Sequence, residues 1–529
     1  MKTSIGRALA VIVGVGLACR VVRYAVNMPL WGDEAFVAVP LLTRTFASLS
    51  RPLAYYQIAP IGWLWAELGV VRVIGASEWA LRLLPFGAGV ASLGLFARFA
   101  AANLDRRSAL MAVALMAASF YPIRHATEVK PYATDLFLSL AVTCLARAAW
   151  KAPDSTRAWA GLTAVGVIGV WASYPLVFVV AGVGMVLGYR AVATRSVRAG
   201  AFAIGFGGAT LASWSVMYLG FGRPQALAAP FLAEMITWED SFPPLGRPWA
   251  WPRWLLIAHT GNMLAYPYGG NHGGSLVTAL LAARGVLVMR RRDPGLLALL
   301  LAPLIPALVA AALQRYPYGT SARISLYFAP AACLLAGRGL AVTIARCLPR
   351  SRIRLALMRV TAGLGVFAVA GAVLVVVLPY KARADLNYRR AVASLTAETT
   401  AGDRWIGFNG LADVPPTKNL MLMPWLQHAA QFHFYALRDA PVPLAWMPKL
   451  AETEPAPSGR TWFLVNRVGY DHFPESLLRE HLARLEERCG AATVRRIEPR
   501  SGESIEVYLF ATPRPAETAG GASGLPRTP

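Results

Sequence analysis

Long apolar runs recur along the first 380 residues of this 529-residue chain. Each is about twenty residues long, the length that an α-helix needs to cross roughly 30 Å of hydrocarbon. Their apolar residues are continuous rather than spaced along one helix face, unlike those of an amphipathic helix. The eleven segments are 5–26, 79–101, 108–123, 132–150, 157–173, 175–189, 199–219, 275–289, 294–313, 322–345 and 356–379. The sequence therefore predicts an all-α polytopic membrane protein with about eleven transmembrane helices.

Basic residues mark the loops on one side of the predicted membrane. If the N-terminus is cytoplasmic, every inner connection is basic, as the positive-inside rule requires. These connections read NLDRRS, KAPDSTR, YRAVATRSVR, MRRRD and RCLPRSRIRLALMR. The net charge is +24, yet the chain from residue 381 onward carries 18 Lys and Arg against 16 Asp and Glu. The excess charge thus follows from membrane orientation, and we expect no nucleic-acid partner.

A twelfth apolar segment, 57–75, would break this alternation if it crossed the membrane. It contains Glu67 and Arg72, together with the helix-breaking Pro60. We therefore expect one or two juxtamembrane helices here, within a first outer loop that spans about 27–78. An ordinary spanning helix is the alternative.

The same alternation places the end of the chain on the non-cytoplasmic side. Residues 1–380 form the predicted membrane domain, and 381–512 alternate between strand-like stretches such as TWFLVNR and helix-like stretches such as PESLLREHLARLEER. This pattern predicts a small soluble α/β domain. The Pro- and Gly-rich segment 513–529 is expected to be a disordered tail.

Acidic residues of the membrane domain are concentrated on the outer side. Before residue 381 the sequence has twelve carboxylates, and nine of them fall in predicted outer positions. The positive-inside rule does not place acids, and an ionised group at membrane depth is costly unless it is paired or in a wet cavity. Arg, carboxylate and aromatic residues share these outer loops, and such a face suits a phosphate-bearing lipid substrate.

Four stretches, in this order, resemble a known superfamily. They are WGDEA after the first helix, GASEWALRLLPF at the end of the first outer loop, ATEVKPYATDLFL in the second, and QRYPYGTSARISLYFAP before a late helix. Together they resemble the C-fold (GT-C) glycosyltransferases that use polyprenyl-phosphate sugars, in particular bacterial relatives of the protein mannosyltransferase and aminoarabinose transferase group. The resemblance covers about residues 5–345.

This resemblance implies a hexosyl or pentosyl transferase in a bacterial inner membrane, with a periplasmic active site and C-terminal domain. The donor would be an undecaprenyl-phosphate-linked sugar, and the acceptor is undefined. Asp33 would be the general base, and Glu34 would support it or bind the acceptor. The substrate-binding residues would be Glu128, Lys130, Arg124, Tyr132, Arg323 and Arg315. The chemistry demands no cofactor, and a divalent cation at the acid pair is an unsupported alternative.

Each site residue also has a structural alternative. The acid pair Asp33-Glu34 could cap a helix, and Glu128 could form an ion pair with Lys130 or Arg124. Arg323 could extend to the membrane interface without binding phosphate. Two other functions also remain open at this point: a transporter or flippase for a lipid-linked sugar, and a non-catalytic envelope assembly protein that acts through its C-terminal domain.

Overall fold

The structure is a computed structural model of the full chain, in which two compact units are distinct. The units are residues 1–383 and 384–529. The described residues are 2–228, 240–270, 275–378, 382–408, 422–446, 449–468, 475–500 and 503–512. The predicted disordered tail, 513–529, lies outside them.

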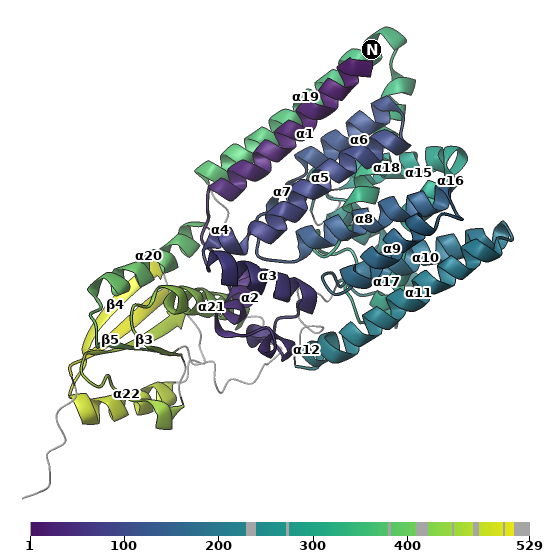
Figure 1. The fold of residues 1–529 in the computed structure, drawn as a ribbon. Helices are drawn as coiled ribbons and strands as arrows, with labels where there is room; N and C mark the ends of the chain where they lie inside the picture. The colour runs from purple at the N-terminus through teal and green to yellow at the C-terminus, as the bar shows by residue number, and fades with distance from the viewer. Residues whose placement is uncertain are drawn as a thin grey trace, which may run out of the picture. The chain divides into compact units, whose positions relative to one another are not determined.

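The first unit is a bundle of helices (Figure 1). Its long helices are α1 (Lys2–Ala25), α5 (Leu83–Asn103), α6 (Arg106–Ala118), α8 (Tyr132–Lys151), α9 (Thr156–Gly169), α10 (Leu176–Ala193), α11 (Val197–Met217), α15 (Leu276–Arg292), α18 (Ala329–Cys347) and α19 (Arg350–Val377). Shorter ones are α2 (Gly32–Thr43), α3 (Ile61–Ile74), α4 (Glu78–Leu81), α7 (Phe120–His125), α12 (Arg223–Leu227), α14 (Trp251–Ala258), α16 (Pro294–Leu301) and α17 (Leu304–Ala312).

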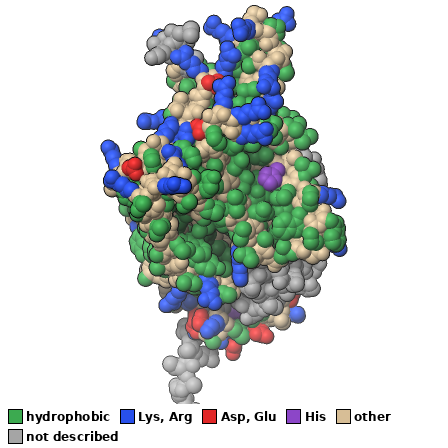
Figure 2. All heavy atoms as spheres, turned by 90° about the vertical axis from the view of Figure 1, so that its right-hand side faces the viewer, with side chains coloured by type: hydrophobic (Ala, Val, Ile, Leu, Met, Phe, Trp, Pro, Cys, Tyr) green, Lys and Arg blue, Asp and Glu red, His purple; other side chains and the backbone are tan. Residues whose placement is uncertain are grey.

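Each of the eleven predicted apolar segments coincides with one or two of these helices. Among the described residues, eight helical stretches are long and apolar enough to cross a membrane. Helices α6, α9 and α15 occupy the other three predicted positions. Hydrophobic side chains cover much of the surface in Figure 2, below a concentration of Lys and Arg side chains. The structure thus confirms a polytopic helical membrane protein.

The predicted segment 108–123 is broken into α6 and α7. The break falls at Ser119, whose backbone is extended, at φ −72° and ψ 127°. Pro122 lacks a backbone N–H, and its ring would clash with the carbonyl of Ala118 if the helix continued. This break lets the chain turn away from the α6 axis just before the polar loop that follows α7.

The first outer loop folds into α2, α3 and α4, which lie together at one end of the bundle (Figure 1). The predicted segment 57–75 forms α3, which packs against α2, α4, α5 and the short 3-10 turn Ser48–Ser50. Its 14 residues extend about 21 Å at 1.5 Å per residue, less than the hydrocarbon thickness. Helix α9 has the same length, so the juxtamembrane position of α3 stays a prediction.

Helix α18 lies at the centre of the bundle, between α6 and α15. Glycines in α18 allow its backbone to approach the backbones of α15 and α6 closely. A Cβ atom on Gly339 would lie 1.8 Å from the carbonyl oxygen of Leu281, and one on Gly337 would lie 2.3 Å from the amide nitrogen of Ala112. The loop that enters α18 is therefore held against a densely packed core, and this loop carries Arg323.

The second unit is a small α/β domain, as the sequence predicts. Its five strands have the order β2-β1-β3-β5-β4; β1 pairs in parallel with β2 and β3, and β5 pairs antiparallel with β3 and β4. The strands are β1 (Arg404–Phe408), β2 (Leu444–Trp446), β3 (Thr461–Val468), β4 (Thr493–Arg500) and β5 (Glu503–Phe510). The helices are α20 (Ala382–Glu398), α21 (Leu422–Asp439) and α22 (Glu475–Cys489). Alternate residues of β1 and β3 pack on α22 in one apolar core.

Candidate active site

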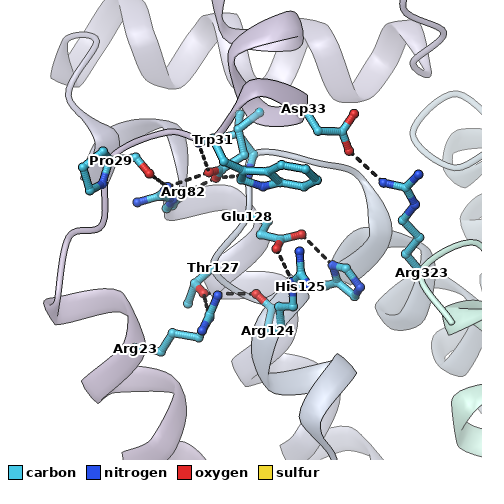
Figure 3. A network of polar contacts seen from close by, with 12 residues as sticks. Arg23, Pro29, Trp31, Asp33, Arg82, Arg124, His125, Thr127, Glu128 and Arg323 are labelled. Atoms are coloured by element: carbon cyan, nitrogen blue, oxygen red, sulfur yellow. Dashed lines mark hydrogen bonds and ion pairs between the residues drawn. The ribbon is translucent and has the colours of Figure 1, made fainter. Parts of the chain in front are cut away.

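Asp33 lies in the first turn of α2 and contacts two cationic side chains. Its Oδ1 is 3.2 Å from Nζ of Lys130, and its Oδ2 accepts a hydrogen bond of 2.9 Å from Nη1 of Arg323. Figure 3 shows Arg323 reaching Asp33 from a separate segment. The three residues come from the first, the second and a late outer loop. The structure therefore brings together three of the predicted site residues around one carboxylate.

Charge determines the protonation state of this cluster. Burial raises the pKa of Asp33, but Lys130 and Arg323 outweigh that effect, so the pKa of Asp33 is below its usual value. Burial also lowers the pKa of Lys130, and the attraction of Asp33 offsets only part of this change. The position of Asp33 at the N-terminus of α2 further favours its anionic form.

Glu34, the neighbour of Asp33, is enclosed by hydrogen bonds. Arg82 donates two of them, from Nε to Oε1 at 2.9 Å and from Nη2 to Oε2 at 2.7 Å. The backbone N–H groups of Val129 and Trp31 donate two more, at 2.9 and 3.2 Å. The Glu34 side chain is 1% exposed and that of Arg82 is 4% exposed. Glu34 therefore connects the first outer loop to the second and has little capacity to contact a substrate.

Glu128 and Arg124 form a second buried pair. Nε of Arg124 donates to Oε1 of Glu128 at 2.5 Å, and Nδ1 of His125 lies 2.8 Å from Oε2. Burial raises the pKa of Glu128, but these two partners outweigh it and hold the pKa well below its usual range. The Arg124 guanidinium also lies over the ring of Trp31, 5.7 Å from its centroid. Both predicted residues are engaged in bracing the second outer loop (Figure 3).

The other two predicted site residues differ in their surroundings. Tyr132 begins α8, is half-buried, and packs edge-on against His125 at a centroid distance of 5.1 Å. Arg315 is exposed, and in the described part of the chain no ion pair joins its side chain to this cluster. Tyr132 thus lies beside the second outer loop, whereas the structure does not bring Arg315 to Asp33.

Two residues outside the predicted set contribute to the site. Gln57 accepts a hydrogen bond of 2.8 Å at Oε1 from Nζ of Lys130. It follows Tyr55 and Tyr56, whose φ angles of 56° and 55° are unusual for residues other than glycine. The second residue outside the predicted set is Arg82, which forms the ion pair with Glu34. The sequence signal for Arg82 is its place in GASEWALRLLPF, whereas Gln57 lies outside all four of the stretches that carry the resemblance.

The described residues contain no group of three or more His, Cys, Asp or Glu side chains that could hold a metal ion. The donor set at Asp33 is instead one carboxylate between two cations. Such an arrangement can exchange a proton at the carboxylate and can neutralise an anionic oxygen at the cations.

Comparisons with known proteins concern the fold. No protein-family model matches the sequence, and no curated protein matches it significantly. Among solved structures, ArnT from Cupriavidus metallidurans in the apo state aligns with a TM-score of 0.54 and 14% identity, over 94% of this chain and 97% of ArnT. ArnT bound to undecaprenyl phosphate aligns with a TM-score of 0.52, at the same identity and coverage.

An oligosaccharyltransferase from Archaeoglobus fulgidus, solved with Zn and sulfate, is also similar in structure. It aligns with a TM-score of 0.50 and 13% identity, over 96% of this chain and 73% of the archaeal protein. These alignments extend over the helical bundle and the C-terminal unit of the chain. The alignments with ArnT and with the archaeal oligosaccharyltransferase agree with the resemblance carried by the four sequence stretches. The chain therefore has the fold of the C-type (GT-C) glycosyltransferases.

Proposed function

We propose that this protein is a membrane glycosyltransferase that moves a sugar from a polyprenyl-phosphate donor to an acceptor at the outer face of the membrane. The observation that carries the proposal is the contact of one carboxylate, Asp33, with both Lys130 and Arg323. Glycosyl transfer from a lipid phosphate requires a proton acceptor and cations near the leaving phosphate. These three side chains supply both within one cluster.

In the proposed reaction, an acceptor hydroxyl attacks the anomeric carbon of the donor sugar. Asp33 takes the hydroxyl proton as the new C–O bond forms. The bond between the anomeric carbon and the phosphate oxygen breaks, and its electron pair stays on the phosphate. Lys130 and Arg323 stabilise the charge that develops there. Direct displacement of this kind inverts the configuration at the anomeric carbon.

The other predicted residues have supporting roles in this proposal. Glu34 holds α2 in place through Arg82, and Glu128 braces the second outer loop through Arg124. We assign Tyr132 and Arg315 to contacts with the substrates, as the sequence resemblance implies. A hexose or pentose on undecaprenyl phosphate is the proposed donor, because an ArnT with this fold was crystallised with undecaprenyl phosphate.

The compartment is part of the same proposal. We place the protein in a bacterial inner membrane, with a cytoplasmic N-terminus and a periplasmic active site and C-terminal domain. The basic inner connections support this orientation, and α15 ends in Arg290, Arg291 and Arg292.

The test is a transfer assay in membranes that contain a labelled polyprenyl-phosphate sugar. We expect Asp33→Asn to abolish transfer while the protein remains folded. A matched control is Asp293→Asn, which neutralises the acid of another ion pair, with Arg147, among the basic inner connections. Full transfer by a folded Asp33→Asn protein would contradict the assignment of the base.

A further inference from the structure

The two neighbouring acids of α2 are held in different ways. Glu34 receives hydrogen bonds from two backbone N–H groups as well as from Arg82. The contacts of Asp33, by contrast, are with the terminal groups of two long cationic side chains, Lys130 and Arg323. Backbone donors cannot leave without unfolding the loop, whereas a side chain can rotate to another anion. The partners of Asp33 are therefore exchangeable, and those of Glu34 are not.

The two acids and their partners also differ in solvent exposure. The Arg323 side chain is 30% exposed and that of Asp33 is 14% exposed, whereas the Glu34 and Arg82 side chains are 1% and 4% exposed. A ligand can reach the Asp33–Arg323 contact from outside the protein. It cannot reach the Glu34–Arg82 pair without opening the loop.

A phosphate can take the place of the carboxylate at this contact. Lys130 and Arg323 are both cationic, and both reach the Asp33 carboxylate. A polyprenyl-phosphate sugar is a phosphodiester with one negative charge, the same charge as an ionised Asp33. An Arg guanidinium binds phosphate oxygens with the same donors that it uses for a carboxylate.

We propose that the Asp33 carboxylate occupies the phosphate-binding position of Lys130 and Arg323 in the unliganded protein, and that the donor phosphate displaces it. This inference rests on the proposed function and adds the order of events. Donor binding transfers the two cations from Asp33 to the phosphate. Asp33 then loses the partners that stabilise its anion and becomes a stronger base for the acceptor hydroxyl.

Gln57 holds the amino group of Lys130 in place during this exchange. It accepts a hydrogen bond from Lys130, so Nζ of Lys130 stays attached to the first outer loop while another of its N–H groups changes partner. Lys130 has three such donors and can serve Gln57 and a phosphate together. The base is therefore activated only when a donor phosphate is present.

Competition between Asp33 and phosphate can be measured without catalysis. The probe is undecaprenyl phosphate, titrated against the purified full-length protein in lipid nanodiscs. We expect Asp33→Asn to bind the probe about fivefold more tightly than the unmodified protein, because a competing ion pair of roughly 1 kcal/mol is removed. We expect Arg323→Gln to bind it more weakly. Asp33→Ala provides a second variant if the asparagine protein does not fold.

A control variant distinguishes direct competition for the cations from a general effect of removing a nearby negative charge. Glu128→Gln removes one negative charge from the same region, but Glu128 contacts Arg124 and His125 rather than the phosphate-binding cations. We expect it to change probe affinity much less than Asp33→Asn. An equal gain in both variants would overturn the displacement and indicate a general charge effect.

The outcomes also separate this inference from the proposed function. Unchanged affinity in Asp33→Asn and Asp33→Ala, together with weaker binding in Arg323→Gln, would refute displacement and leave the transferase proposal intact. If the unmodified protein neither binds undecaprenyl phosphate nor transfers sugar, the proposed function itself fails.

Discussion

Arg82 and Glu34 form a forked ion pair that connects α2 to the junction between α4 and α5. The two N–O distances are 2.9 and 2.7 Å, and both side chains are almost completely buried. Arg82 also donates to the backbone carbonyl of Pro29 at 3.3 Å. One side chain thus fixes both the entry into α2 and the acid next to Asp33.

Loss of this guanidinium should destabilise the membrane unit. Arg82→Leu leaves Glu34 buried without its cation, and removal of one partner from a buried pair costs about 3–5 kcal/mol. We expect a large fall in the thermal unfolding midpoint of the purified protein. The double variant Arg82→Leu/Glu34→Leu should recover part of the loss, because it leaves no unpaired charge. No recovery in the double variant would show that the pair itself is not the cause.

Gln57 should act on catalysis through Lys130. Gln57→Leu removes the acceptor for one Lys130 N–H, and we expect kcat/KM for the donor to fall about tenfold, as for a hydrogen bond to a charged group of roughly 1.5 kcal/mol. The thermal unfolding midpoint should change little, since Gln57 is half-buried. Gln57→Glu should restore Lys130 positioning. A large loss of stability in Gln57→Leu would instead indicate a structural role.

The pH dependence should differ between the free protein and the donor complex. The low pKa of Asp33 in the unliganded protein keeps it ionised, so kcat/KM should hold its value until the pH falls below the usual titration range of a carboxyl group. If the donor phosphate displaces Asp33, the acidic limb of kcat should lie at higher pH than that of kcat/KM. Measurement of both profiles with a saturating acceptor checks this. Coincident limbs would contradict displacement.

Glu128 should make the fold sensitive to acid. Arg124 and His125 hold the pKa of Glu128 in the folded protein well below its usual value of about 4.5. The resulting stability is therefore present above about pH 4.5 and is lost as the pH falls through the lower, folded value. We expect the unfolding midpoint to fall on acidification in this range, and less steeply in Glu128→Gln. Equal slopes for the two proteins would show that other groups dominate.

Gly339 should tolerate no side chain. The added Cβ of Gly339→Ala would overlap the Leu281 carbonyl, a backbone atom that cannot rotate away. We expect a loss of at least 1–3 kcal/mol from overpacking between α18 and α15. Gly363→Ala in α19 is the control, because no heavy atom lies within 4 Å of its added Cβ. Similar unfolding midpoints for the two variants would contradict the predicted clash.

Local patterns in the sequence were sufficient for the membrane helices. A twenty-residue apolar run must form a helix to satisfy its backbone hydrogen bonds in lipid, so each such run could be identified by itself. The break at Ser119, three residues before Pro122, was harder to foresee, since α6 and α7 form one continuous apolar segment in the sequence. The physical signal was present in the proline, but the run of hydrophobic neighbours obscured it.

The sequence by itself thus determined the helical membrane class, the α/β end domain and the loops that carry the acids. Only the tertiary structure decided which of those acids meet which cations. Asp33 and Arg323 are 290 positions apart, and their contact depends on the packing of α18 in the bundle. The tertiary structure also distinguished the two adjacent acids, because consecutive residues of a helix point in different directions. Asp33 points toward the cationic side chain of Arg323, and Glu34 forms a buried ion pair with Arg82.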